Sequence, residues 1–245
     1  ELLQSPNIDC RQDGAKLEAK HRASYLFNSG ISGIDEADNC LLIGTNPRWE
    51  AALLNARLRK RYLNGGFRVF NIGQDLDLTF PVENLGETPD VLSAIVSGSH
   101  KVSECLANHA RSMLILGQGA LTRSDGGAVL GAGRLIAENC GMVKEDWNGF
   151  NVLHVAAARV AGLDLGLIPG EGGKDLSGIL AGAEAGDIEV VFLLGADEIN
   201  MNKLGNAFVI YIGHHGDAGA SRADVVLPGA TFLEKNATWV TTEGR

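Results

Sequence analysis

Apolar and polar positions alternate in blocks along this chain, and the clearest apolar blocks end at a glycine. Five of them read LLIG, FNIG, LILG, FLLG and IYIG, and they end at Gly44, Gly73, Gly117, Gly195 and Gly213. Short apolar runs bounded by turn residues are typical of buried strands, and near-continuous apolarity indicates that both faces of the sheet are covered. With a sixth run that stops at Pro228, the predicted strands span residues 40–43, 67–72, 112–116, 188–194, 207–212 and 224–227.

Between several of these strands, apolar residues recur at the spacing of a helix. After Gly44, the side chains of Thr45 and Asn46 can cap a helix, Pro47 suits its first turn, and alanine and leucine then recur on one face. The predicted helices span residues 48–63, 89–97, 125–140 and 152–163, and the predicted loops span residues 74–88 and 166–187. Strands that alternate with helices indicate an α/β fold with mainly parallel sheets covered by helices.

The pattern repeats loosely, which predicts two related α/β lobes. In each half, a strand, a glycine and a polar turn precede a second strand that ends in Ile-Gly. The predicted parts are an irregular leading segment (1–24), a first lobe (25–143), a linking helix with a glycine-rich loop (144–185) and a truncated second lobe (186–245).

Net charge, cysteine spacing and the length of the apolar runs exclude several classes of function. The net charge of −9 argues against nucleic acid as a partner, because such proteins carry basic patches. The four cysteines are widely spaced and form no CxxC pair, so no zinc or iron–sulfur site is expected in this segment. No apolar run approaches the roughly 20 residues of a membrane-spanning helix, so no direct membrane span is expected.

Ligands of parallel α/β sheets bind beyond the carboxyl ends of the strands, and polar residues gather there in both lobes. The turn after the first strand can hold an anion such as a phosphate, although many such turns bind nothing. An acidic residue after the fourth long strand could meet a ribose hydroxyl or simply stabilise a helix start. The adjacent histidines could form a metal or acid–base site, or a hydrogen-bonded tight turn. The candidate pocket residues are Gly44, Thr45, Asn46, Asp197, His214, His215 and Asp217.

A cluster of basic residues closes the first predicted helix. It consists of Arg57, Arg59, Lys60 and Arg61. Positive charge at a helix end is stabilised by the helix dipole, which is one explanation. The other is that some of these residues pair with carboxylates of a neighbouring lobe or subunit.

Several separated motifs resemble the large iron–sulfur subunit of respiratory complex I, in its domain similar to molybdopterin oxidoreductases. They are GTNPR (44–48), LLGAD (193–197), GHHGD (213–217), ADVVLPGA (223–230) and TEGR (242–245). The resemblance runs from about residue 25 to the end of the chain. The GHHGD turn is more similar to mitochondrial members. Because family members usually continue past the TEGR motif, the resemblance favours a fragment, a split-gene product or part of a longer chain.

The resemblance implies a structural domain without cofactor, catalytic residue or metal, in the peripheral arm of complex I on the matrix side of the mitochondrial inner membrane. The [2Fe–2S] and [4Fe–4S] clusters of the family belong to an N-terminal part that this chain does not match. The implied partners are that part and other peripheral-arm subunits. In catalytic relatives the GTNP-type turn contacts a guanosine phosphate of the molybdopterin cofactor. The alternatives are therefore an active molybdopterin-dependent oxidoreductase domain and a free nucleotide-binding module.

Overall fold

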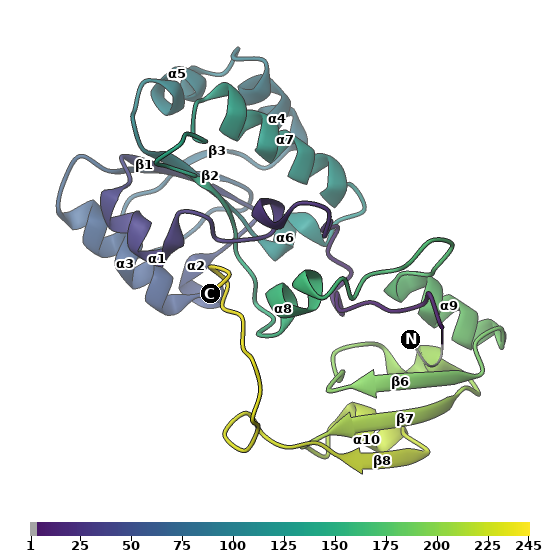
Figure 1. Ribbon diagram of the computed structural model, residues 1–245. Helices are drawn as coiled ribbons and strands as arrows, with labels where there is room; N and C mark the ends of the chain where they lie inside the picture. Colours follow the sequence, from purple (N-terminus) through teal and green to yellow (C-terminus); the bar gives the residue numbers. More distant parts are fainter. Residues whose placement is uncertain (1–3) are drawn as a thin grey trace. The chain divides into compact units, whose positions relative to one another are not determined.

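A computed structural model describes residues 4–245, which form two compact α/β units (Figure 1). The larger unit comprises Ala15–Asp164 and Val240–Arg245, and the described part of the smaller unit comprises residues 4–14 and Leu165–Trp239. The first three residues of the predicted leading segment lie outside the described residues. Among residues 4–245, no helix is both long and apolar enough to cross a membrane.

The larger unit is built on a five-stranded sheet in which every neighbouring pair is parallel. The central strands are fully buried, because helices cover both of their faces. The order β3-β2-β1-β4-β5 places the point where the chain reverses direction across the sheet between β1 and β4. The strands are β1 (Asn39–Ile43), β2 (Arg68–Ile72), β3 (Glu83–Gly86), β4 (Ser112–Leu116) and β5 (Phe150–Val152).

Helices form a layer on each side of this sheet (Figure 1). One face packs Cys40, Leu42 and Val69 against Leu54 and Leu58 of α3. The opposite side carries α4 and α7, which pack on each other. The helices are η1 (Arg22–Ser24), α1 (Gly30–Gly33), η2 (Ile34–Glu36), α2 (Pro47–Glu50), α3 (Ala52–Leu63), α4 (Pro89–Val96), α5 (Lys101–Ala107), α6 (Gln118–Leu121), α7 (Gly126–Asn139) and α8 (Arg159–Asp164).

The smaller unit is a three-stranded parallel sheet in the order β6-β7-β8. Its core brings together Ala183, Val191, Leu204, Val209 and Tyr211, which come from two helices and two strands. The elements are α9 (Leu176–Ala185), β6 (Val190–Leu194), η3 (Met201–Leu204), β7 (Phe208–Gly213), α10 (Ala218–Arg222) and β8 (Val225–Pro228).

The last residues of the chain pack against the start of the larger unit, which accounts for the TEGR motif. The Phe27 amide donates to the Thr242 carbonyl at 2.9 Å, and the Ile31 amide donates to the Glu243 carboxylate at 2.7 Å. Arg22 donates to the Gly244 carbonyl at 2.8 Å. These residues therefore close the larger unit rather than continue the smaller one.

The predicted α/β class with parallel sheets is confirmed, and all six predicted strands are present. The helix predicted over residues 152–163 is wrong in its first half, since Val152 belongs to β5 and a helix begins only at Arg159. Residues 150–152 pair in parallel with β4, with Leu114 opposite Phe150. Pairing with a distant strand therefore places Val152 in the sheet, whereas the alanines 156–158 lie in neither a helix nor a strand.

Two further elements fall where the sequence predicted loop, and one predicted helix is interrupted. Residues 166–187 contain α9, which begins where the Asp175 carboxylate accepts the Gly178 amide at 2.9 Å and ends at Gly186, with φ +85°. The predicted loop 74–88 contains β3. The predicted helix 48–63 is interrupted at Ala51, whose backbone is not helical.

The turns that end β1 and β4 touch, and this contact requires glycine. Gly44 has φ +57°, and a Cβ atom there would lie 2.6 Å from the backbone nitrogen of Ala120. A Cβ atom on Gly117 would lie 2.3 Å from the Cβ of Thr45. Both glycines are therefore needed for the two strand ends to approach.

Each unit contains a buried tyrosine that donates its hydroxyl to an aspartate. Tyr25 donates to Asp164 at 2.7 Å, and Tyr211 donates to Asp197 at 2.8 Å. Burial, reinforced by the nearby carboxylate, raises the pKa of each tyrosine from 10.0 to about 12. The neutral phenol is thus favoured in the folded state.

We predict that Gly44→Ala lowers the free energy of unfolding by about 2–5 kcal/mol. The added methyl group would strain the backbone at positive φ and would also clash with Ala120, and both effects destabilise the folded state. Gly127→Ala is the matched control, since an added Cβ in that helix meets no atom within 4 Å and alanine favours helix. Denaturant unfolding of both variants measures the difference. Equal stability of the two variants would contradict the close contact of the turns.

We predict that the free energy of unfolding falls as pH rises from about 10 to 12. A tyrosine whose pKa is higher in the folded than in the unfolded state stabilises the fold fully below its unfolded pKa. That contribution is lost as pH rises through its folded pKa. Tyr211→Phe should reduce this loss in the smaller unit, and Asp197→Asn should lower the pKa of Tyr211 by removing a charge. Denaturant unfolding and tyrosinate absorbance across this pH range measure both effects. Ionisation of all three tyrosines near pH 10 in the folded protein would contradict the pairing.

Candidate functional site

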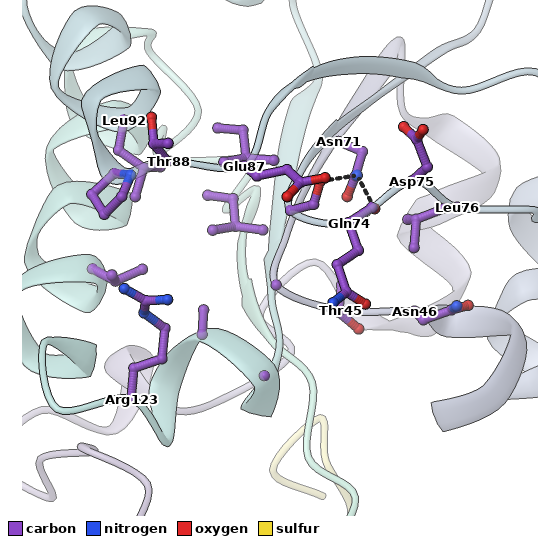
Figure 2. A pocket seen from close by; sticks show the side chains of 18 of the residues that line it. Thr45, Asn46, Asn71, Gln74, Asp75, Leu76, Glu87, Thr88, Leu92 and Arg123 are labelled. Atoms are coloured by element: carbon purple, nitrogen blue, oxygen red, sulfur yellow. Dashed lines mark hydrogen bonds between the residues drawn. The ribbon is translucent and has the colours of Figure 1, made fainter.

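A pocket of about 500 Å³ lies at the carboxyl ends of β1 and β2 in the larger unit (Figure 2). Gly44, Thr45 and Asn46 form one wall, so the sequence-predicted turn does line a pocket. Residues 73–76 after β2, residues 87–89 before α4, and α6 after β4 supply the rest. The pocket therefore occupies the reversal point of the sheet, where ligands of α/β proteins bind.

Two donors of the GTNP turn are engaged by a side chain of this chain, whereas the buried Asn46 Oδ1 has no hydrogen-bond partner among the described residues. The Thr45 hydroxyl donates to the Glu50 carboxylate at 2.7 Å, and the Asn46 amide donates to its other oxygen, also at 2.7 Å. Glu50 reaches back from the first turn of α2 in the manner of a capping box. Its charge thus stands at the place where the turn would hold an anion.

The other charged side chains around the pocket are mostly acidic. Asp75 and Glu87 line it beside Glu50, whereas Arg123 is the one cation among the lining residues. Figure 2 shows Arg123 on the wall opposite Asn46. Its guanidinium is bound to both oxygens of Asp125, at 2.7 and 2.8 Å, and this contact lowers the pKa of the Asp125 carboxyl. The positive charge is therefore already compensated.

The remaining predicted pocket residues belong to the smaller unit, and Asp197 among them has local hydrogen-bond partners. Besides the Tyr211 hydroxyl, the Asp197 carboxylate accepts the Gly219 amide of α10 at 2.8 Å. In the described part of the chain, no helix begins at Asp197 itself, because the next element, η3, begins at Met201. His214 and His215 are exposed, and their ring centroids lie 4.3 Å apart. Asp217 is also exposed and precedes α10. Within residues 4–245, no three His, Cys, Asp or Glu side chains are grouped to hold a metal ion.

Two members of the basic cluster at the end of α3 form contacts within their own unit, whereas Arg59 and Lys60 are exposed. Arg57 pairs with Asp35 at 2.8 Å, where each side chain is about one-third exposed. Arg61 donates to the Ala37 and Gly65 carbonyls, both at 2.8 Å, and its guanidinium lies over the Phe67 ring. A carboxylate partner is thus found for Arg57, but in the same unit rather than in another lobe.

Sequence reasoning missed the side chains that decide the character of this pocket. Glu50 could have been found, because a carboxylate one turn after a polar cap is a capping signal. Asp75, Glu87 and Arg123 come from three separate loops. Their sequence neighbourhoods carry no sign that folding brings them together.

Comparison with protein families places the entire chain in one of them. The family model described as "Molybdopterin oxidoreductase" matches residues 1–245. The resemblance of the separated motifs to this family is therefore confirmed over the full length.

Individual relatives carry names from NADH dehydrogenases. The chain is 42% identical over 241 residues to "NADH dehydrogenase [ubiquinone] iron-sulfur protein 1, mitochondrial" of Solanum tuberosum, covering 98% of this chain and 31% of the relative. It is 39% identical over 239 residues to the "NADH-ubiquinone oxidoreductase 75 kDa subunit" of Reclinomonas americana, covering 98% of this chain and 34% of the relative. It is 43% identical over 226 residues to the "NADH-ubiquinone oxidoreductase 78 kDa subunit, mitochondrial" of Candida albicans, covering 91% of this chain and 30% of the relative.

The chain thus spans about a third of the length of these relatives. Its resemblance to the large iron–sulfur subunit of complex I extends over nearly all of its own residues. The fold, the position of the pocket and the family match lead to one assignment: this chain belongs to the molybdopterin oxidoreductase family.

Proposed function

We propose that this chain is a structural domain, without bound cofactor, of the peripheral arm of respiratory complex I. In this role it supports electron transfer from NADH to ubiquinone, which other parts of the complex carry out. The observation that carries the proposal is the Glu50 carboxylate, which takes the Thr45 and Asn46 donors of the GTNP turn. The resemblance implies that a turn of this type contacts a guanosine phosphate of the cofactor in catalytic relatives.

The residues around the pocket do not fit a cofactor that carries a diphosphate. Such an anion needs unengaged N–H donors and positive charge, as at the anion sites of helix N-termini and Arg or Lys clusters. Here the pocket presents Glu50, Asp75 and Glu87, and the guanidinium of Arg123 is bound to Asp125. Negatively charged side chains close to a phosphate repel it and therefore weaken its binding. No catalytic step is therefore assigned to a molybdopterin group in this chain.

The surface of the larger unit suits a packing role. Trp49 and Leu53 are 80% and 89% exposed on the neighbouring helices α2 and α3. Large apolar side chains that gather on a surface are typical of protein contacts. We expect their partners to be other peripheral-arm subunits or the cluster-bearing part of the same subunit, on the matrix side of the mitochondrial inner membrane.

The cysteines are consistent with clusters being held elsewhere. Cys40 and Cys140 are buried, and burial raises the pKa of both thiols. A raised pKa disfavours the thiolate that iron–sulfur ligation requires. The proposal therefore places the [2Fe–2S] and [4Fe–4S] clusters outside the residues of this chain.

We predict that the assembly isolated through a tag on this chain contains complex I subunits, and that the chain separated from it carries neither stoichiometric molybdenum and pterin nor stoichiometric iron. Native mass spectrometry and metal analysis measure these quantities, with a molybdopterin enzyme from the same host as the loaded control. About one molybdenum with pterin per chain would identify an active oxidoreductase domain instead. A tightly held nucleotide without complex I subunits would identify a free nucleotide-binding module.

A further inference from the structure

A second pocket, of about 640 Å³, lies at the amino ends of β1 and β2, at the opposite edge of the larger sheet from the GTNP turn. We call it the amino-edge pocket. Its walls come from the last turn of α3, the turn that follows this helix, the first residues of β1 and β2, and the end of α5. None of the predicted pocket residues and no group discussed so far as a cofactor site lies in it.

Asn39, the first residue of β1, lines this pocket with a buried amide side chain. The residue is 1% exposed, and within residues 4–245 neither its Nδ2 nor its Oδ1 has a hydrogen-bond partner. Buried polar groups are paired in the great majority of cases, because an unpaired one destabilises the fold. Leu41 and Ile43, which follow on the same face of the strand, are apolar and fully buried. Packing alone therefore favours an apolar residue at this position, and the unpaired amide points to a ligand.

The register of the sheet shows what lies over this amide. Asn39 is opposite Arg68 of β2 on one side and Ser112 of β4 on the other, so the three side chains share one face. The Ser112 hydroxyl donates to the Leu106 carbonyl at 2.6 Å, and the Arg68 guanidinium donates to the Cys105 sulfur at 3.6 Å. The helix α5 thus spans the amide, and Arg68 and Cys105 stand between the amide and the pocket.

The cover that these two side chains provide is held weakly. A thiol is a weak hydrogen-bond acceptor, so the contact between Arg68 and Cys105 costs little to break. The Arg68 side chain is 60% exposed and is also bonded to Glu83 of β3 at 2.7 Å, away from β1. A ligand in the pocket can therefore displace the contact with the thiol while the ion pair with Glu83 is kept.

The charges at this edge argue against an ionic ligand. The guanidinium of Arg68 is neutralised by Glu83, and the Asp38 carboxylate accepts the Arg111 amide at 2.8 Å. The outer wall, formed by residues 62–67, is apolar at Leu63 and Phe67. A buried amide offers one donor and one acceptor in a single plane. Its complement is a neutral, planar group with an acceptor beside a donor.

We propose that the amino-edge pocket binds a small, neutral, planar ligand whose edge carries a hydrogen-bond donor beside an acceptor. Adenine belongs to this class, since asparagine pairs with it through two hydrogen bonds, and so does a carboxamide such as nicotinamide. In the complex, Asn39 donates to the ligand and accepts from it, and the ligand lies against Cys105. The pocket is separate from the GTNP turn, so the proposal goes beyond the structural role and can fail without it.

The Cys105 thiol reports occupancy of the pocket. In a Cys10→Ser background it is the accessible native thiol, because Cys40 and Cys140 are buried. The rate at which a thiol reagent labels it is measured without ligand and with millimolar adenine, nicotinamide or purine. Purine keeps the ring system of adenine but has no amino donor, so it is the matched control ligand.

Variants of Asn39 separate recognition by the amide from simple blocking of the pocket. Asn39→Leu removes the amide at similar size, and Asn39→Val, which suits a buried strand, is a second replacement. Circular dichroism checks that each variant folds. Glu171→Cys, in an exposed loop of a chain with Cys10 and Cys105 replaced by serine, shows whether a ligand acts on the reagent itself.

We predict that adenine or nicotinamide slows labelling of Cys105 by at least about threefold, because the bound fraction rises with ligand concentration and a bound ligand covers the thiol. Protection by adenine alone identifies a nucleobase site, and protection by nicotinamide alone identifies a carboxamide site. Purine should leave the rate unchanged, and no ligand should protect the Asn39 variants.

Three results would overturn the proposal. The first is labelling that neither adenine nor nicotinamide slows. The second is equal protection by purine, or protection that persists in both Asn39 variants, because the amide then plays no part. The third is equal slowing of Glu171→Cys, because the effect then lies in the reagent.

Discussion

The contact between the turns that end β1 and β4 is the constraint on which the site depends. Gly44 and Gly117 lie so close to Ala120 and Thr45 that no side chain fits at either glycine. Because the two strands lie at the reversal point of the sheet, this contact fixes the direction in which the chain enters α2. It thereby brings Glu50, one turn later, back to the donors of Thr45 and Asn46.

The same geometry supports the proposed structural role. The turn after β1 is followed by a carboxylate, Glu50, that accepts two donors of that turn from the first turn of α2. An internal carboxylate thus accepts the Thr45 hydroxyl and the Asn46 amide without a ligand. In the proposed role the function lies on surfaces such as that of Trp49 and Leu53 rather than in the pocket.

How much the sequence predicts depends on whether the signal is local. The glycine-ended strands and the α/β class were predictable, since apolar runs and turn residues are adjacent in sequence. The strand β5 was not, because residues 150–152 become a strand only by pairing with β4. The helix α9 was hidden by its glycines, although Asp175 and Gly186 mark its ends. The Thr45–Asn46 wall of the pocket was predictable, whereas Asp75, Glu87 and Arg123 meet only through tertiary folding.

The central claim is that Glu50 excludes a phosphate-bearing ligand from the GTNP turn. Titration calorimetry with guanosine diphosphate, on the wild-type chain beside Glu50→Gln, tests it most directly. The variant removes the negative charge and keeps one oxygen acceptor, so it can accept from the Asn46 amide but no longer from both donors with separate oxygens. The account predicts no measurable binding to the wild-type chain at millimolar ligand and weak, measurable binding to the variant. Micromolar binding to the wild-type chain would contradict it.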